Sequence, residues 1–212
     1  MMNDDELRQT RTDYGKQVLL EDAAGLQPFE LFQSWFKDAL SMEKEANAMT
    51  LSTGLEQPSS RVVLLKEVNE KGFVFYTNYS SQKGLEIEIN PNVGLLFFWQ
   101  NLERQVRIQG RAVRVSEKES DAYFYSRPIE SQIGAIASDQ SRVLGSRDEL
   151  EERVRTLTEK YKTEKIVRPK TWGGYMVKPD LIEFWQGRSS RLHDRLQYKL
   201  VNDQWLRSRL FP

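Results

Sequence analysis

The chain of 212 residues contains no cysteine and a single histidine, His193. Without cysteine the protein can form no disulfide, zinc–thiolate site or thiol nucleophile, and a reducing cytoplasm is the expected location. A single histidine excludes a multi-histidine metal site, so no metal is expected. The N-terminus has no apolar signal core, and no run of about 18 apolar residues occurs, so we expect neither export nor a membrane span.

Neither charge is in excess, because 31 lysines and arginines balance 31 aspartates and glutamates. This balance argues against a general nucleic-acid or membrane footprint, so no such partner is expected and any anion site is a local construction. With 39% hydrophobic and 11% aromatic residues, the chain can bury a substantial core. We expect a mobile polar arm over residues 1–27 and one domain over residues 28–212.

Hydrophobic periodicity predicts an α+β fold of about seven or eight antiparallel strands, forming a barrel with peripheral helices. Helices are predicted from Pro28, from Ser80 or Ser81 to a point before Pro91, at Glu117–Ser126, from Ser131, and at Arg147–Tyr161. Strands are predicted at Ala48–Thr53, Ser60–Val68, Phe73–Thr77, Val93–Trp99, Arg104–Val115, Gly174–Val177, Leu181–Trp185, Arg191–Val201 and Gln204–Leu210.

Finer features of these strands are also predicted. Asn69–Gly72 and the pair Asn202-Asp203 each suit a hairpin turn. Val62–Leu65 is apolar on both faces, which favours a strand buried inside the barrel. A slip in the apolar alternation near Gly110 indicates a bulge.

The only histidine lies among three arginines in WQGRSSRLHDR, residues 185–195. If a strand begins at Arg191, then Arg191, His193 and Arg195 share one face, and such a row of cations suits an anion such as phosphate. A solvated strand edge with a surface histidine explains the segment equally well. His193 and Asp194 would point to opposite faces, so no Ser-His-Asp triad is indicated.

Two further cations stand where a phosphate could bind. Lys83 follows two serines at a predicted helix N-terminus, where free N–H groups favour an anion. Arg127 follows Tyr123 by four residues and precedes Ser131, so a guanidinium, a phenol and a hydroxyl could converge on a second anion. Taken singly, each cation is most simply a solvated side chain. Neither a P-loop nor a Rossmann glycine pattern occurs, which argues against ATP or NAD held in the usual way.

Other polar residues could bind a flat heterocycle. Gln105, Arg107 and Gln109 alternate along one predicted strand, Gln140 and Ser141 form a polar pair, and Trp185 could cover a ring. A solvent-facing strand and a core tryptophan are the simpler alternatives. Because paired hydrolytic carboxylates are not indicated, an enzyme with these residues is expected to rely on a bound cofactor.

Eight segments carry a further signal: RVVLLK (61–66), FYTNYSSQKG (75–84), RQVRIQG (104–110), YFYSRPIESQIGA (123–135), SDQS (138–141), WGGY (172–175), EFWQG (183–187) and RLHDR (191–195). Together, and in this order, they resemble the pyridoxamine 5′-phosphate oxidase family. The resemblance implies an FMN-binding split β-barrel and a homodimer with FMN at the subunit interface. It also implies oxidation of pyridoxine or pyridoxamine 5′-phosphate by O₂ to pyridoxal 5′-phosphate and H₂O₂.

The same resemblance assigns roles to individual residues. FMN would be held by Arg61, Val62, Val63, Leu64, Leu65, Lys66, Tyr76, Thr77, Gln82, Lys83, Gln105, Gln140, Ser141, Trp185 and Arg195. The substrate phosphate would be held by Lys66, Tyr123, Arg127 and Ser131. Arg191 and His193, the candidate catalytic residues, would hold the substrate ring. Arg11 and Tyr14 resemble an N-terminal segment that closes over the substrate.

Gln82 departs from the family pattern, which usually has arginine beside the flavin phosphate lysine. One charge-assisted contact, worth about 1.5–3 kcal/mol, would then be missing. The ending RLFP in place of the commoner RLAP has no evident chemical consequence. Two alternatives stay open: a related flavin oxidase acting on another aromatic substrate, as in phenazine assembly, and a non-enzymatic flavin-binding protein. Both share the FMN site, so the residues expected to hold substrate distinguish them.

Overall fold

The computed structural model describes residue 8 and residues 12–212. Its contacts group the chain into two compact units. Unit 1 comprises the described residues up to Met49, with Leu95–Gln109 and Asp180–Pro212, and unit 2 comprises Thr50–Gly94 and Gly110–Pro179. The expected single domain over residues 28–212 stays a prediction.

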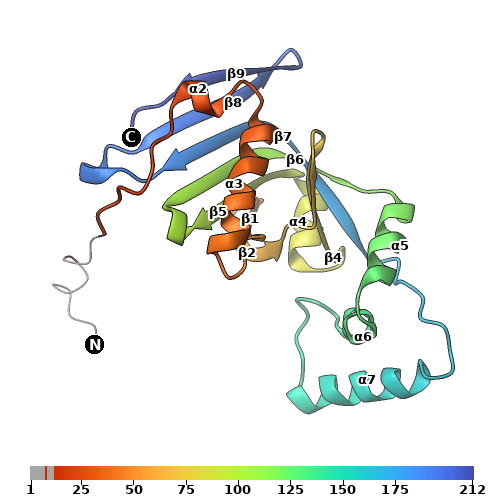
Figure 1. Cartoon of the computed structure of the whole chain (residues 1–212). Helices are drawn as coiled ribbons and strands as arrows, with labels where there is room; N and C mark the ends of the chain where they lie inside the picture. Colours follow the sequence, from red (N-terminus) through yellow and green to blue (C-terminus); the bar gives the residue numbers. More distant parts are fainter. Residues whose placement is uncertain (1–7, 9–11) are drawn as a thin grey trace. The chain divides into compact units, whose positions relative to one another are not determined.

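Figure 1 shows the order of the elements along the chain. The helices are α2 (Glu21–Ala24), α3 (Pro28–Met42), α4 (Gln82–Ile89), α5 (Glu117–Ser126), α6 (Ile129–Ala137) and α7 (Arg147–Lys160), with 3₁₀ turns η1 (Gln100–Leu102) and η2 (Ser189–Arg191). The strands are β1 (Ala48–Gly54), β2 (Pro58–Leu64), β3 (Glu67–Asn69), β4 (Gly72–Asn78), β5 (Asn92–Trp99), β6 (Arg104–Arg114), β7 (Trp172–Gln186), β8 (Asp194–Val201) and β9 (Gln204–Arg209). In the described part of the chain the strands follow the order β2-β1-β5-β6-β7-β4-β3, and β8 pairs with β7 and β9.

Helix α3 supplies much of the core of unit 1. Proline at its first position suits the helix start, and aromatic residues recur on one face, so Phe32 is 0% exposed and Trp35 is 5% exposed. The ring of Trp35 meets Phe184 of β7 edge-on at 5.3 Å between centroids. The predicted helix from Pro28 is confirmed, and its aromatic stripe packs the core.

The C-terminal hairpin β8–β9 receives part of the N-terminal region. Asn202 and Asp203 adopt left-handed φ values of 49° and 60°, as a two-residue hairpin turn requires. Tyr198 Oη donates to the carbonyl oxygens of Ala24 and Gly25, both at 3.0 Å. The described part of the segment predicted as a mobile arm thus contains a short helix, α2, which contacts this hairpin through those hydrogen bonds (Figure 1), and the mobility of the arm stays a prediction.

In unit 2, β3 and β4 form the predicted hairpin, with Asn69 opposite Gly72. Strand β4 then pairs antiparallel with the first half of β7, from Phe73 opposite Val177 to Asn78 opposite Trp172. Helix α5 begins with the predicted capping box between Ser116 and Glu119. Helix α6 follows it directly and packs against α7 (Figure 1).

Several strand predictions are wrong in detail. The strand expected over Ser60–Val68 is interrupted at residues 65–66, where the backbone N–H of Lys66 donates a hydrogen bond to the carbonyl oxygen of Val74. Strand β2 lies at an end of the sheet order, so Val62 is 65% exposed and the buried strand expected there is not found. The two strands expected on either side of Pro179 are one, because β7 continues through that residue.

The bulge expected at Gly110 is likewise not seen in the burial pattern. Burial alternates without a slip from Arg104 to Ala112, and Gly110 is one of the buried positions. A side-chain carbon at Gly110 would collide with the backbone carbonyl of Lys178. Glycine is therefore needed at this position because the two backbones approach each other closely. Helix α6 also starts at Ile129, two residues before the predicted Ser131.

Candidate active site

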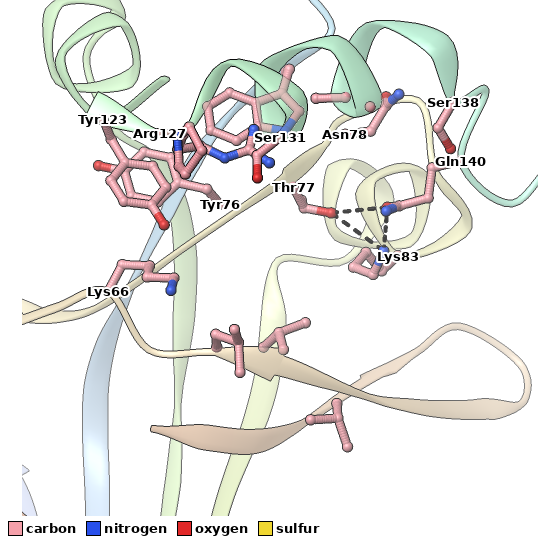
Figure 2. A pocket seen from close by; sticks show the side chains of 17 residues that line it. Lys66, Tyr76, Thr77, Asn78, Lys83, Tyr123, Arg127, Ser131, Ser138 and Gln140 are labelled. Carbon is pink, nitrogen blue, oxygen red and sulfur yellow. Dashed lines mark hydrogen bonds between the residues drawn. The ribbon is translucent and has the colours of Figure 1, made fainter. Parts of the chain in front are cut away.

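A cavity of about 720 Å³ opens in unit 2, between residues of β2, β4, α4, α5 and α6 (Figure 2). It brings together the following predicted site residues: Val62, Val63, Leu64, Lys66, Tyr76, Thr77, Lys83, Tyr123, Arg127, Ser131 and Gln140. Three of them are cations, and none of the described residues that line the cavity is acidic. The charge of the lining therefore suits an anionic ligand.

Lys83 is the centre of one polar group in this cavity. Ser81 caps helix α4, so the lysine falls in its first turn, with its side chain buried among neutral oxygens. Its Nζ donates to Gln140 Oε1 at 2.7 Å, to Ser81 Oγ at 3.2 Å and to Thr77 Oγ1 at 3.3 Å. Burial, together with the charge of Arg61, lowers the pKa of Lys83 to about 8. A cation held by neutral partners at a helix N-terminus is suited to binding a phosphate.

Arg127 is the centre of a second polar group, at the C-terminal end of α5. Its guanidinium carbon lies 4.9 Å from the ring centroid of Trp172, and burial lowers its pKa. In the described structure its Nη1 is buried without a hydrogen-bond partner, which ordinarily costs about 1–3 kcal/mol. Figure 2 shows Tyr123 and Ser131 beside it, whereas Thr77, Lys83 and Gln140 lie further along the same cavity. An anion oxygen would satisfy the free donor.

The donors of the cavity therefore form two groups, one around Lys83 and one around Arg127 (Figure 2). Lys66 lines the cavity below Tyr123 in the same view. Two separate cationic groups with hydroxyl or phenol donors fit a phosphorylated cofactor and a phosphorylated substrate. The role of each residue stays a prediction.

Four predicted cofactor residues of unit 2 do not line this cavity: Arg61, Leu65, Gln82 and Ser141. Arg61 instead pairs with Glu86 at 3.0 Å and donates to Thr53 Oγ1 at 2.5 Å. Gln82 Nε2 also donates to Glu86, at 2.9 Å. Glu86 was missed, although its place four residues after Gln82 on α4 is the spacing at which helical side chains meet.

A second cavity, of about 670 Å³, lies in unit 1 and is lined by Thr12, Asp13, Tyr14, Arg188, Ser190, Arg191 and His193. The imidazole packs against Trp185, with 4.5 Å between ring centroids, and edge-on against Tyr14 at 5.9 Å. Its Nδ1 accepts the backbone N–H of Arg188 at 3.1 Å. Burial, followed by the charge of Arg191, lowers the pKa of His193 from 6.5. The imidazole in this lining is therefore neutral at pH 7, with Nδ1 as the acceptor and its hydrogen on Nε2.

The strand expected from Arg191 is wrong. Ser190 and Arg191 adopt left-handed φ values of 55° and 60° in the turn η2, and β8 begins only at Asp194. Arg191 and His193 thus reach the second cavity from a turn. Arg195 does not line it.

Arg195 and two other predicted cofactor residues also belong to unit 1. Arg195 lies opposite Trp185 in the β7–β8 register, and its Nε and Nη2 contact Glu183 at 2.9 and 2.8 Å. Glu183 is 3% exposed and also pairs with Arg107 at 2.6 Å. This carboxylate, which sequence reasoning missed, neutralises part of the expected row of cations. Gln105 is half-buried on β6. Arg11 lies outside the described residues.

Residues 36–161 match the family model described as pyridoxamine 5′-phosphate oxidase, and residues 172–212 match the pyridoxine 5′-phosphate oxidase C-terminal dimerisation region. The chain belongs to the pyridoxamine 5′-phosphate oxidase family. A relative from Acaryochloris marina is 53% identical over 205 residues, covering 95% of this chain and 94% of its own. One from Leptospira biflexa is 50% identical over the full length of both chains. Both are named pyridoxine/pyridoxamine 5′-phosphate oxidase. This family member is therefore an enzyme, an oxidoreductase.

Solved structures agree with this membership. PhzG from Burkholderia lata, crystallised with tetrahydrophenazine-1-carboxylic acid, matches with a TM-score of 0.88 and 28% identity, over 94% of this chain and all of its own. An FMN-binding protein from Nostoc punctiforme, related to pyridoxamine 5′-phosphate oxidase, shares the fold with a TM-score of 0.70 and 14% identity. The predicted fold class, an α+β split β-barrel of antiparallel strands with helices, is confirmed. Among the described helices none is long and apolar enough to cross a membrane.

Proposed function

We propose that this oxidase converts pyridoxine 5′-phosphate and pyridoxamine 5′-phosphate to pyridoxal 5′-phosphate with FMN as its cofactor. Pyridoxine phosphate and O₂ give pyridoxal phosphate and H₂O₂; the amine additionally consumes water and releases ammonia. The observation that carries the proposal is the cavity of unit 2, with three cations, no described acidic lining residue and an unpartnered buried guanidinium nitrogen. Such a lining supports two phosphate-bearing ligands.

The cofactor phosphate is assigned to the group around Lys83. Lys83, Thr77 and Gln140 already contact one another, so their donors are ordered before a ligand arrives. When bound, FMN would accept the two electrons removed from the substrate and deliver them to O₂. We also propose a homodimer, because residues 172–212 match the dimerisation region.

The substrate phosphate is assigned to Tyr123, Arg127, Ser131 and Lys66 in the same cavity. The substrate ring is assigned to Arg191 and His193, which belong to unit 1. Because Nδ1 accepts the N–H of Arg188, the neutral imidazole carries its hydrogen on Nε2, and it would have to give up the Arg188 hydrogen bond to take the proton lost from the C4′ oxygen or nitrogen. Tyr14 lines that second cavity and packs against His193, as expected for a residue that covers substrate.

The deciding experiment compares pyridoxine 5′-phosphate with pyridoxine as substrates of the purified enzyme under air. We expect a yellow dimer with one FMN per chain and equal amounts of O₂ consumed and H₂O₂ formed. The phosphorylated substrate should have a kcat/KM higher by at least about a hundredfold, because a site built to bind a polar group rejects analogues without it. Equal efficiency on the two substrates, or a colourless protein that takes up no FMN, would contradict the proposal.

The same assay tests the alternative of another aromatic substrate, which the similarity to PhzG from Burkholderia lata favours. A phenazine precursor such as tetrahydrophenazine-1-carboxylic acid is the comparison substrate. The Arg127→Met variant tests whether that guanidinium serves the phosphate, whereas the wild-type kcat/KM on each substrate separates the two functions, because the precursor's carboxylate is also an anion that arginine can bind. A loss confined to pyridoxine 5′-phosphate supports the vitamin B6 reaction, whereas oxidation of the phenazine precursor alone supports the other.

A further inference from the structure

Arg168 lies in the connection between α7 and β7, and only 5% of its side chain is exposed. Its Nε donates to Asp121 Oδ1 at 2.7 Å, and its Nη2 forms an ion pair with Glu117. Both carboxylates lie on α5, four residues apart and hence on one face of the helix. Its Nη1 donates to the carbonyl of Trp172, the first residue of β7. One buried guanidinium therefore ties α5 to the start of β7.

These two elements carry the aromatic and cationic side chains at the substrate end of the cavity. The rings of Tyr123 and Trp172 are nearly parallel, at 8° with 6.1 Å between centroids. Tyr76 stacks on Tyr123 at 4.0 Å, and the guanidinium of Arg127 lies over Trp172. The positions of Tyr123 and Arg127 in the cavity therefore depend on how α5 is held against Trp172.

We propose that Arg168 is a positioning residue for phosphate recognition. It fixes α5 against Trp172 so that the phenol of Tyr123 and the guanidinium of Arg127 meet the substrate phosphate together. This inference rests on the proposed function, because it assigns the phosphate to those two side chains. A pre-ordered guanidinium binds a phosphate without first losing conformational freedom, so loosening α5 should weaken binding even though no direct contact is removed.

Loss of Arg168 is expected to leave a folded protein. Glu117 and Asp121 have side chains that are 77% and 48% exposed, so water can solvate both carboxylates once their partner is gone. The backbone N–H of Arg168, which donates to Tyr125 Oη at 3.3 Å, stays in place whatever the side chain. Removing the Arg168 side chain should therefore change the position of α5 more than it lowers the stability of the fold.

The test is Arg168→Met in the FMN-loaded enzyme, measured with pyridoxine 5′-phosphate, with pyridoxine, and with inorganic phosphate as a competitive inhibitor. We expect KM for the phosphorylated substrate and the inhibition constant of inorganic phosphate each to rise by about tenfold, as expected for a displaced phosphate ligand. The kcat, the flavin content and the efficiency with unphosphorylated pyridoxine should each stay within about twofold, because those measurements do not use the phosphate group. Arg168→Lys should behave like the methionine variant, since one ammonium cannot reach Asp121, Glu117 and the Trp172 carbonyl together.

Arg147→Met is the matched control, because this arginine is 77% exposed on α7 and, among the described residues, its ion pair is with Glu151 of the same helix. Asp121→Asn is the second variant, which keeps the Glu117 and Trp172 contacts and should raise the same two constants by a smaller factor. If Arg168→Met lowers the efficiency with both substrates equally, or changes only the unfolding temperature, Arg168 is purely structural and the inference is wrong. If Arg127→Met itself leaves phosphate discrimination intact, the proposed function fails instead.

Discussion

Glu103 Oε2 accepts a hydrogen bond from the backbone N–H of Gly15 at 2.8 Å. It also accepts the next N–H, of Lys16, at 3.0 Å. Glu103 is 6% exposed and adopts a left-handed φ of 55°, and its own carbonyl accepts Gly187 N–H at 2.7 Å. Tyr14, which immediately precedes Gly15, packs edge-on against Trp185 with 5.7 Å between ring centroids. The carboxylate of Glu103 therefore fixes the N-terminal segment beside the second cavity.

Glu103→Gln keeps the size of the side chain, but the N-terminal segment should detach more often in this variant. A neutral acceptor makes weaker hydrogen bonds than a carboxylate, so we expect opening to become easier by about 1 kcal/mol, or about fivefold. Limited trypsin digestion that follows cleavage after Lys16 measures the opening. Glu151→Gln, on the exposed face of α7, is the control. Unchanged cleavage would mean that the two hydrogen bonds do not hold the segment.

FMN affinity of the flavin-free protein should fall as pH rises through about 8. Burial, with Arg61 nearby, lowers the pKa of Lys83 to about 8, so the lysine is cationic below that pH and neutral above it. A bound phosphate favours the cation, and binding above pH 8 must therefore take up a proton. Flavin fluorescence titrations should show the affinity falling by up to about tenfold per pH unit on that side.

Lys83→Met provides the control for this pH dependence. The variant should bind FMN more weakly at pH 7 and show a flatter profile between pH 7 and 9, since Tyr76, with a pKa raised to about 12 by burial, does not ionise in that range. Calorimetry in buffers of different ionisation enthalpy would detect the proton uptake directly. Wild-type affinity that is constant across this range would show that Lys83 does not contact the phosphate.

Local features of the fold could be predicted from the sequence because a few neighbouring residues determine them. The capping box of α5 and the Asn202-Asp203 turn lie as predicted, since their hydrogen bonds and backbone angles are set within a few residues. The start of β8 could not be predicted. Ser190 and Arg191 take left-handed angles without glycine, and such a turn has no sequence signature.

The candidate site shows the same limit. The groups around Lys83 and Arg127 were each visible as a local cluster, and the family resemblance supplied their joint role. The carboxylates that form ion pairs with these cations were not predicted. Glu183 and Arg107 are 76 residues apart in the sequence, and Glu86 and Arg61 are 25 residues apart. Such long-range pairs depend on strand register and helix placement, which periodicity alone does not specify.

Arg191→Met and His193→Asn should keep the flavin spectrum but lower kcat/KM, by about 10²-fold or more if the imidazole transfers a proton. The pKa of His193 is lowered from 6.5 by burial and by Arg191, so the neutral form dominates at pH 7. In the wild type, kcat/KM should therefore fall only below pH 6.5, and the asparagine variant should lack this acid limb. Normal turnover and flavin binding in both variants would show that the two residues are not catalytic.

Arg195→Met should weaken both FMN retention and stability, and Glu183 allows the two effects to be separated. Arg195 contacts this buried carboxylate through Nε and Nη2, so its removal leaves Glu183 with Arg107 alone. Removing one partner of a buried charged group costs about 1–3 kcal/mol of stability. The cost lies near the upper end of this range only if water cannot reach the carboxylate of Glu183. The flavin-free variant should therefore unfold at a lower temperature than the wild type.

The double variant Arg195→Met with Glu183→Met removes the carboxylate together with its partner. Methionine fills the buried position, and Arg107, whose side chain is 44% exposed, can turn to water, so the unfolding temperature should recover toward that of the wild type. FMN affinity should not recover if Arg195 contacts the flavin directly. Thermal unfolding and fluorescence titration of the flavin-free single and double variants measure the two quantities independently. Recovery of FMN affinity in the double variant would show that Arg195 acts on the cofactor only by holding Glu183.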